Sequence, residues 1–182
     1  ILSLTSADAT TLTLVAATGA VTVNVGTGSL TVGSLTATGH SISLTAAGAV
    51  LDGDATTDIA SESLSITAAS VGSSTDALDI SVATLTLNTF AGAAYLNEAS
   101  ALIVASSTTG ILSLSAVGAT SLTQVNASGS VTVNVSAGSL TVGSVSAAGL
   151  AVGLTASGAV LDSDTSVDIT AESLSITAAS VG

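Results

Sequence analysis

The chain has 182 residues, a formal net charge of −12 and no Lys, Arg, Cys, Met, Trp or Pro. Without cationic side chains it cannot neutralise phosphate, which excludes nucleic-acid partners and disfavours anionic membrane surfaces. The lack of Cys excludes disulfides and thiolate metal sites. No apolar run reaches the length of a membrane-spanning helix, so we expect no membrane insertion. We expect no cofactor.

A long internal repeat organises the sequence. The eleven residues from Glu62 to Gly72 recur unchanged from Glu172 to Gly182, and a shift of 110 positions aligns residues 1–72 with 111–182 without a gap, at about 47 identical pairs. Such a repeat indicates a fixed structural block. We predict one continuous body over 1–182, with a first copy at 1–110 and a partial second copy at 111–182. Because the chain begins at Ile1, we expect a segment cut from a longer protein.

The predicted elements, taken in chain order, are short strands. Apolar and small polar residues alternate with a period of two, which is typical of strands with one buried face. Glycines between them favour turns. The alternating segments in the first copy are Leu2–Leu4, Leu12–Leu14, Val21–Val25, Leu30–Val32, Ile42–Leu44, Leu64–Ile66, Leu78–Ile80 and Leu85–Leu87.

A shorter period of about 20 residues lies inside the repeat, which predicts a parallel β-solenoid whose strands pair with their equivalents one coil away. We interpret the 110 residues as five coils, because inward pairs begin at Leu2, Val23, Ile42, Leu64, Leu85 and Leu112. The widest interval, from Leu85 to Leu112, holds Phe90, Tyr95, Asn97 and Glu98, and we predict that it contains a loop protruding from the rod. The alternative fold is a pair of tandem immunoglobulin-like sandwiches, for which 110 residues is a usual size. The scarcity of aromatics and the 20-residue period count against it.

The segments Ile42–Leu51 and Val152–Leu161 share the pattern of alternating residues followed by Ala-x-Gly-Ala-Val-Leu. This pattern resembles the repeats of filamentous-haemagglutinin-type giant adhesins of bacteria, and the likeness covers essentially the whole chain. The resemblance implies a right-handed parallel β-helix in the shaft of a surface-exposed or secreted filamentous protein. It offers no catalytic residues to carry over.

Two acidic clusters are candidate calcium sites, because carboxylates at alternate positions of a turn can converge on Ca²⁺. The sequence lacks the glycine-rich nonapeptide of calcium-binding solenoids. We therefore favour the interpretation that these are solvated corner residues that deter edge pairing. The clusters are Asp52, Asp54 and Asp58, and Asp162, Asp164 and Asp168.

No catalytic constellation is evident, and we predict that the chain is not an enzyme. The single His40 is replaced by Leu150 in the second copy, and Ser has no histidine partner to activate it. The patterns at Asn126 and Asn134 match N-glycosylation sequons by chance, in our interpretation, since the first copy lacks them. An inward Gln124 would need a backbone partner.

These observations lead us to expect a structural segment, such as a stalk, spacer or filament body, of a long extracellular or cell-surface protein. Its partners would be neighbouring repeats, or other copies through end-to-end or lateral association. One alternative is a binding surface for ice or glycans on outward threonines, and another is a self-assembling fibre subunit. The threonines expected to form that surface are Thr13, Thr22, Thr31, Thr45, Thr67 and Thr86.

Overall fold

The computed structural model describes residues 1–182 and shows a β-solenoid of about 9 turns, with strands stacked about 20 residues apart and no helix. Every strand pairs in parallel with its neighbours, and the only antiparallel pairing is an isolated bridge between Ser73 and Asp76. This confirms the predicted parallel solenoid. It rules out the tandem sandwiches, because neighbouring strands in their sheets run antiparallel.

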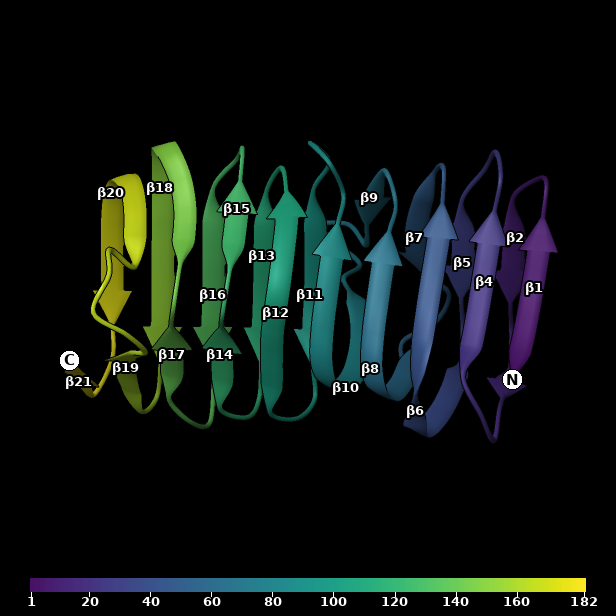
Figure 1. Cartoon of the computed structure of the whole chain (residues 1–182), viewed down its shortest axis with the longest axis horizontal. Helices are drawn as coiled ribbons and strands as arrows, with labels where there is room; N and C mark the ends of the chain where they lie inside the picture. The colour runs from purple at the N-terminus through teal and green to yellow at the C-terminus, as the bar shows by residue number, and fades with distance from the viewer.

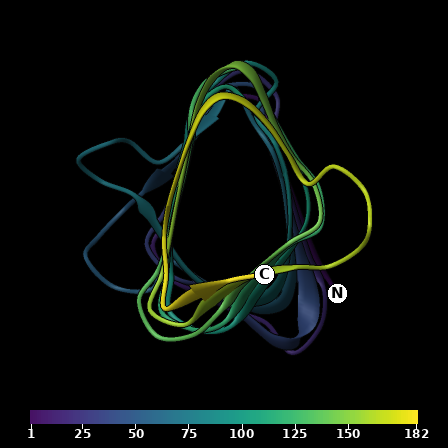
Figure 2. The same ribbon diagram turned by 90° about the vertical axis from the view of Figure 1, so that its left-hand side faces the viewer.

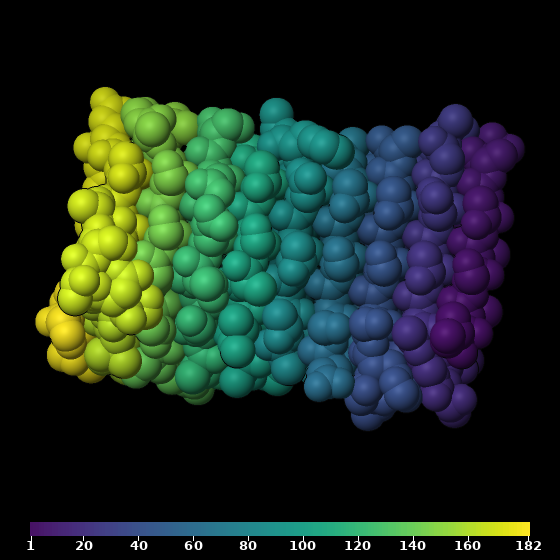
Figure 3. Space-filling model, in the orientation of Figure 1, coloured from purple at the N-terminus to yellow at the C-terminus, as the bar shows by residue number.

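The chain winds in a right-handed sense. In Figure 1 the strands nearest the viewer point upward while successive coils advance from the N-terminus on the right to the C-terminus on the left. Seen along the rod, the coils superpose as a rounded triangle from which a few loops project (Figure 2). The space-filling view shows the coils as side-by-side ribs across the whole width of the rod (Figure 3).

Each coil consists of one longer straight side and two shorter sides, and the longest strands continue around a corner. In the first copy the strands are β1 (Leu2–Ser6), β2 (Thr10–Leu12), β3 (Val15–Ala16), β4 (Val21–Val25), β5 (Leu30–Val32), β6 (Leu35–Ala46), β7 (Ala49–Asp52), β8 (Ile59–Thr67), β9 (Ser70–Val71), β10 (Leu78–Asn88), β11 (Ala94–Glu98) and β12 (Leu102–Thr109). In the second copy they are β13 (Leu112–Ala116), β14 (Thr120–Leu122), β15 (Val125–Ala127), β16 (Val131–Val135), β17 (Leu140–Val142), β18 (Val145–Ala156), β19 (Ala159–Asp162), β20 (Ile169–Thr177) and β21 (Ser180–Val181).

Alternation along each strand fills the interior. In β4 the three valines are buried, while Thr22 and Asn24 between them are exposed. Val, Leu, Ile and Ala from successive coils form one cluster of 41 buried residues. The backbone hydrogen bonds that link the coils run along the rod, from each strand to its equivalent in the next coil. The core is therefore a single column wrapped by small polar residues.

The 110-residue repeat does not contain a whole number of coils. Starting from Leu2, the column of stacked residues reaches Leu122, the repeat equivalent of Leu12, and does not include Leu112. Its members are Leu2, Val21, Ile42, Leu64, Leu85, Val104 and Leu122. Leu112 instead continues the column of Thr10, Leu30, Val50, Val71 and Ala94. The five-coil interpretation was therefore wrong, because Val104 takes the place above Leu85 that it assigned to Leu112.

The two columns change places relative to the sequence repeat in the segment from β10 to β15. The five-residue strand β11 pairs with both β9 and the beginning of β10, and its other edge pairs with β13. The longer β12, which covers the end of β10, is followed by the two short strands β14 and β15. At about 20 residues per coil, 110 residues make about five and a half coils. Equivalent segments of the two copies consequently lie on opposite sides of the rod.

The projecting loops follow this half-turn. Residues 53–58, between β7 and β8, and residues 72–77, between β9 and β10, leave the rod on the left in Figure 2. Residues 163–168, the repeat equivalents of 53–58, leave it on the right.

The loop predicted between Leu85 and Leu112 is limited to a short turn between β10 and β11. The rest of this interval is occupied by the end of β10 and by β11 and β12, with Tyr95, Asn97 and Glu98 all in β11. Only Phe90 lies in a turn, where it is exposed and has a φ of 55°. The interval looked wide because its two ends belong to different sides of the rod.

Candidate functional site

The first acidic corner is formed by residues 52–58, where the chain leaves β7 and enters β8. Asp54 is exposed, whereas Asp58 is fully buried. The backbone N–H of Asp54 donates to Asp52 Oδ1 at 2.7 Å. The backbone N–H and the hydroxyl of Thr56 donate to Asp54 Oδ1 at 2.8 and 2.6 Å. These bonds order the loop around its own carboxylates.

Asp58 is fixed between the coils on either side of it. Its backbone carbonyl accepts from Leu35 N–H at 2.7 Å, and its backbone N–H donates to the carbonyl of Asp79 at 2.8 Å. The N–H of Asp79 also donates to Asp58 Oδ2 at 2.9 Å. The second carboxyl oxygen, Oδ1, is buried without any hydrogen-bond partner. An unpaired buried carboxyl oxygen is unfavourable.

The electrostatics of this corner are those of carboxylates without a counter-charge. Burial raises the pKa of Asp58 to about 7, and the nearby Asp52 and Asp79 add to the rise. Burial also raises the pKa of Asp52, to which the negative charges of Asp76 and Asp79 contribute. The Thr56 hydroxyl and N–H lower the pKa of the exposed Asp54. No Lys or Arg exists in the chain to balance these acids.

The second acidic corner, residues 162–168, repeats the arrangement on the opposite side of the rod. Its three carboxylates, from Asp162, Asp164 and Asp168, converge so that one oxygen of each lies within 4.8 Å of the others. The N–H of Asp164 donates to Asp162 Oδ1 and that of Ser166 to Asp164 Oδ1, each at 2.6 Å. Asp168 Oδ1, like Asp58 Oδ1, is buried without a partner. The interpretation as solvated corner residues therefore fits Asp54, Asp162 and Asp164, which are exposed, but not Asp58, which is buried.

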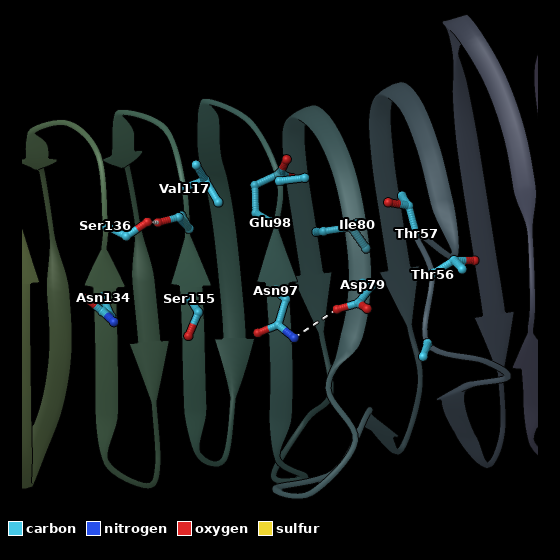
Figure 4. A pocket seen from close by; sticks show the side chains of 13 residues that line it. Thr56, Thr57, Asp79, Ile80, Asn97, Glu98, Ser115, Val117, Asn134 and Ser136 are labelled. Carbon is cyan, nitrogen blue, oxygen red and sulfur yellow. Dashed lines mark hydrogen bonds between the residues drawn. The ribbon is translucent and has the colours of Figure 1, made fainter.

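A polar groove of about 610 Å³ runs along the rod beside the first corner. Its floor is a row of aligned side chains on neighbouring strands, Asp79, Asn97, Ser115 and Asn134, which Figure 4 shows in line. The amide of Asn97 donates to Asp79 Oδ1 at 2.8 Å, the dashed line in Figure 4. Thr56 and Thr57 of the first acidic corner form one end of the groove.

Glu98 also lines this groove, although its side chain is almost fully buried between Ile80 and Ala116 in the neighbouring coils. Its Oε2 accepts from Val82 N–H at 3.0 Å, and its Oε1 accepts from the N–H and hydroxyl of Ser100 at 2.8 and 2.7 Å. Burial raises the pKa of Glu98, and these hydrogen bonds oppose the rise. The alternation Leu96-Asn97-Glu98 places Glu98 on the same face as Leu96, a signal that could have identified it as inward.

The remaining candidates lie apart. The predicted threonine array divides: Thr22 and Thr86 share one outward row, while Thr45 and Thr67 lie in the next. Thr31 lies in β5 on another side, and Thr13 lies in the turn after β2. The side chains of three further residues are exposed, at His40, Asn126 and Gln124.

Comparisons with known proteins found no match: no family model, curated protein or solved structure matches the chain. None of the elements is a helix with the length and apolar character needed to cross a membrane.

Proposed function

We propose that the chain is a structural segment of a long extracellular or cell-surface protein, where it serves as a stalk, spacer or filament body. The observation that carries this proposal is the unbroken apolar column, which links every coil to the next through parallel backbone hydrogen bonds. Solenoids of this kind gain stability coil by coil, so their length can grow without a new core. About nine coils at roughly 4.8 Å each give a rod about 43 Å long.

The resemblance to filamentous-haemagglutinin-type adhesins supports a shaft role, with adhesion residing elsewhere in the parent protein. To test it, antibodies raised against residues 1–182 would label intact, unfixed cells for electron microscopy. We expect label along thin rods that extend from the cell or are shed from it. Label confined to the cell interior, or to globular particles, would exclude the shaft role.

The polar groove supports a second candidate, a glycan-binding surface. The aligned Asp79, Asn97, Ser115 and Asn134 present amides, hydroxyls and a carboxylate over several coils, groups that hydrogen-bond sugar hydroxyls. Glycan-array binding that is lost in Asn97→Ala but retained in His40→Ala, another exposed position, would favour this candidate. Equal array signals for both variants would count against it.

We also propose that such a segment associates with neighbouring repeats, because each coil pairs in parallel with the next through backbone hydrogen bonds. Sedimentation velocity over a hundredfold concentration range should reveal self-association of the isolated chain. A monomer throughout that range would contradict association by coil-to-coil pairing.

A further inference from the structure

We propose that the two acidic corners, Asp52–Asp58 and Asp162–Asp168, are calcium-binding sites. This inference concerns the loops and does not depend on the shaft role. Its two supports are the convergence of three carboxylates in the second corner and the buried, unpartnered oxygen of Asp58 in the first.

The ligand pattern is the same in both corners. Carboxylates stand at the first, third and seventh positions, and a hydroxyl residue, Thr56 or Ser166, stands at the fifth. Alternate positions of one loop can turn their oxygens to the same side. Ca²⁺ takes six to eight oxygen ligands in flexible geometry, so three carboxylates supplemented by backbone carbonyls and water suit it.

The second corner shows the convergence directly. Oxygens from Asp162, Asp164 and Asp168 lie within 4.8 Å of one another, a spacing that lets one ion contact all three. Like charges this close repel one another, and the protein has no cation of its own to place between them. A cation from solution would convert the repulsion into attraction.

The first corner supplies the independent observation. Asp58 has no exposed surface, one of its oxygens is held by Asp79 N–H, and the other has no partner. The carboxyls of Asp58 and Asp52 are close enough for each to affect the pKa of the other, which places the Asp58 carboxyl at the acidic corner. A buried carboxyl oxygen normally has a partner. A calcium ion held between Asp58 and Asp52 would provide it.

The coil that follows the first corner brings Asp76 and Asp79 close enough to influence the pKa of Asp52. We expect one ion in each corner.

The experiment is a titration of chelator-treated protein with CaCl₂ at pH 8, followed by isothermal titration calorimetry and thermal melting. Wild type should bind two ions and melt at a higher temperature with calcium. Asp58→Asn should lose the site in the first corner, with affinity reduced roughly tenfold or more. Asp168→Asn should lose only the site in the second corner. The matched control is Asp8→Asn, which removes the same charge from an exposed residue outside both corners and should bind like wild type.

Three results would overturn the proposal. The first is the absence of binding heat and of any melting shift at 10 mM CaCl₂. The second is equal loss of calcium affinity in Asp58→Asn and Asp8→Asn, which would indicate diffuse screening of a charged surface. The third is an equal shift with MgCl₂ at the same concentration, which would refute calcium as the preferred ion. If Asp58→Asn does not fold, Asp54→Asn replaces it, because Asp54 is exposed and a ligand in the same corner.

Discussion

At the scale of single residues, the interior contains a few hydroxyls whose hydrogen bonding differs although their burial is the same. Thr109 and Thr120 are both almost completely buried. The hydroxyl of Thr120 donates to the carbonyl of Gly118 at 3.1 Å, whereas that of Thr109 has no partner. Their contributions to stability should therefore have opposite signs.

Replacing Thr109 by Val keeps the shape of the side chain and removes the unpaired hydroxyl. We expect the free energy of unfolding to rise by about 1 kcal/mol, because an unpaired buried polar group is destabilising. Thr120→Val, the matched variant, should lower it by about 1 kcal/mol, since it removes a hydrogen bond. Urea denaturation followed by circular dichroism measures both. A fall in stability for Thr109→Val would mean that its hydroxyl has a partner in solution.

Glu98 makes stability depend on pH. Its pKa is raised above 4.5 in the folded protein, mainly by burial, so the folded state holds its proton more tightly than the unfolded state. The resulting stabilisation is complete below pH 4.5 and is lost as pH rises through the folded pKa. When the free energy of unfolding is measured from pH 4 to 8, we expect Glu98→Gln to lose the part of the pH dependence that Glu98 contributes. Glu62→Gln, an exposed control, should keep the wild-type slope.

Removing the Glu98 carboxylate altogether tests its structural role. Glu98→Ala leaves the N–H groups of Val82 and Ser100 without their acceptor inside the rod. We expect the free energy of unfolding to fall by about 3 kcal/mol at pH 7, because bonds to charged groups and buried unpaired donors both contribute. Glu62→Ala should change it by less than about 0.5 kcal/mol. A similar small change for both variants would show that water replaces Glu98.

At the scale of elements, the long strands β6 and β18 turn a corner without ending. Each contains a register shift, between Ala37 and Ser41 in β6 and between Ala147 and Ala151 in β18. The glycine inside each shift has a positive φ, 70° at Gly39 and 75° at Gly149. L-residues rarely adopt this conformation, so a glycine is needed for the corner.

Gly149→Ala isolates this requirement, because an added Cβ would meet nothing within 4 Å. We expect a loss of about 1 kcal/mol in the free energy of unfolding, from backbone strain alone. Gly153 in the same strand has equally open space but no positive φ. Gly153→Ala should therefore be neutral or stabilise by up to about 1 kcal/mol. If both variants lose the same stability, strain at Gly149 is not the cause.

The strands were predictable to a large extent because alternation is a local signal. Val21, Val23 and Val25 lie inward as their spacing requires. What the sequence did not reveal is which strands stack, because stacking depends on the side of the rod that each strand occupies. Leu85 and Leu112 look equivalent along the chain, yet they lie in different columns. The same limit applies to Asp58, whose burial results from the coil that carries Asp79.

At the scale of the whole molecule, the coil is the unit that can be added or removed. Excising residues 21–41 would place Ile42 directly on Leu2, whose column it already shares through Val21. We expect the shortened protein to fold cooperatively and its rod to be about 4.8 Å shorter by small-angle X-ray scattering.

The matched deletion removes about half a coil. Excising residues 21–30 would place Thr31 directly after Ala20, so that the short β5 would stand where the five-residue β4 is needed. No strand like β11, which pairs with two strands of the preceding coil, is present there to accommodate the half-coil shift. We expect loss of the cooperative melting transition. Comparable melting of both deletions would show that a shift of half a coil does not disrupt the stacking of strands.

The half-turn between successive copies also determines the mechanics of any array built from this unit. A third copy would return to the azimuth of the first after about eleven coils, or about 53 Å at the usual strand spacing. The acidic corners of successive copies would then project alternately from opposite flanks of the rod. Loads on groups bound at these corners would then act on both flanks, so that their bending moments would tend to cancel along the axis.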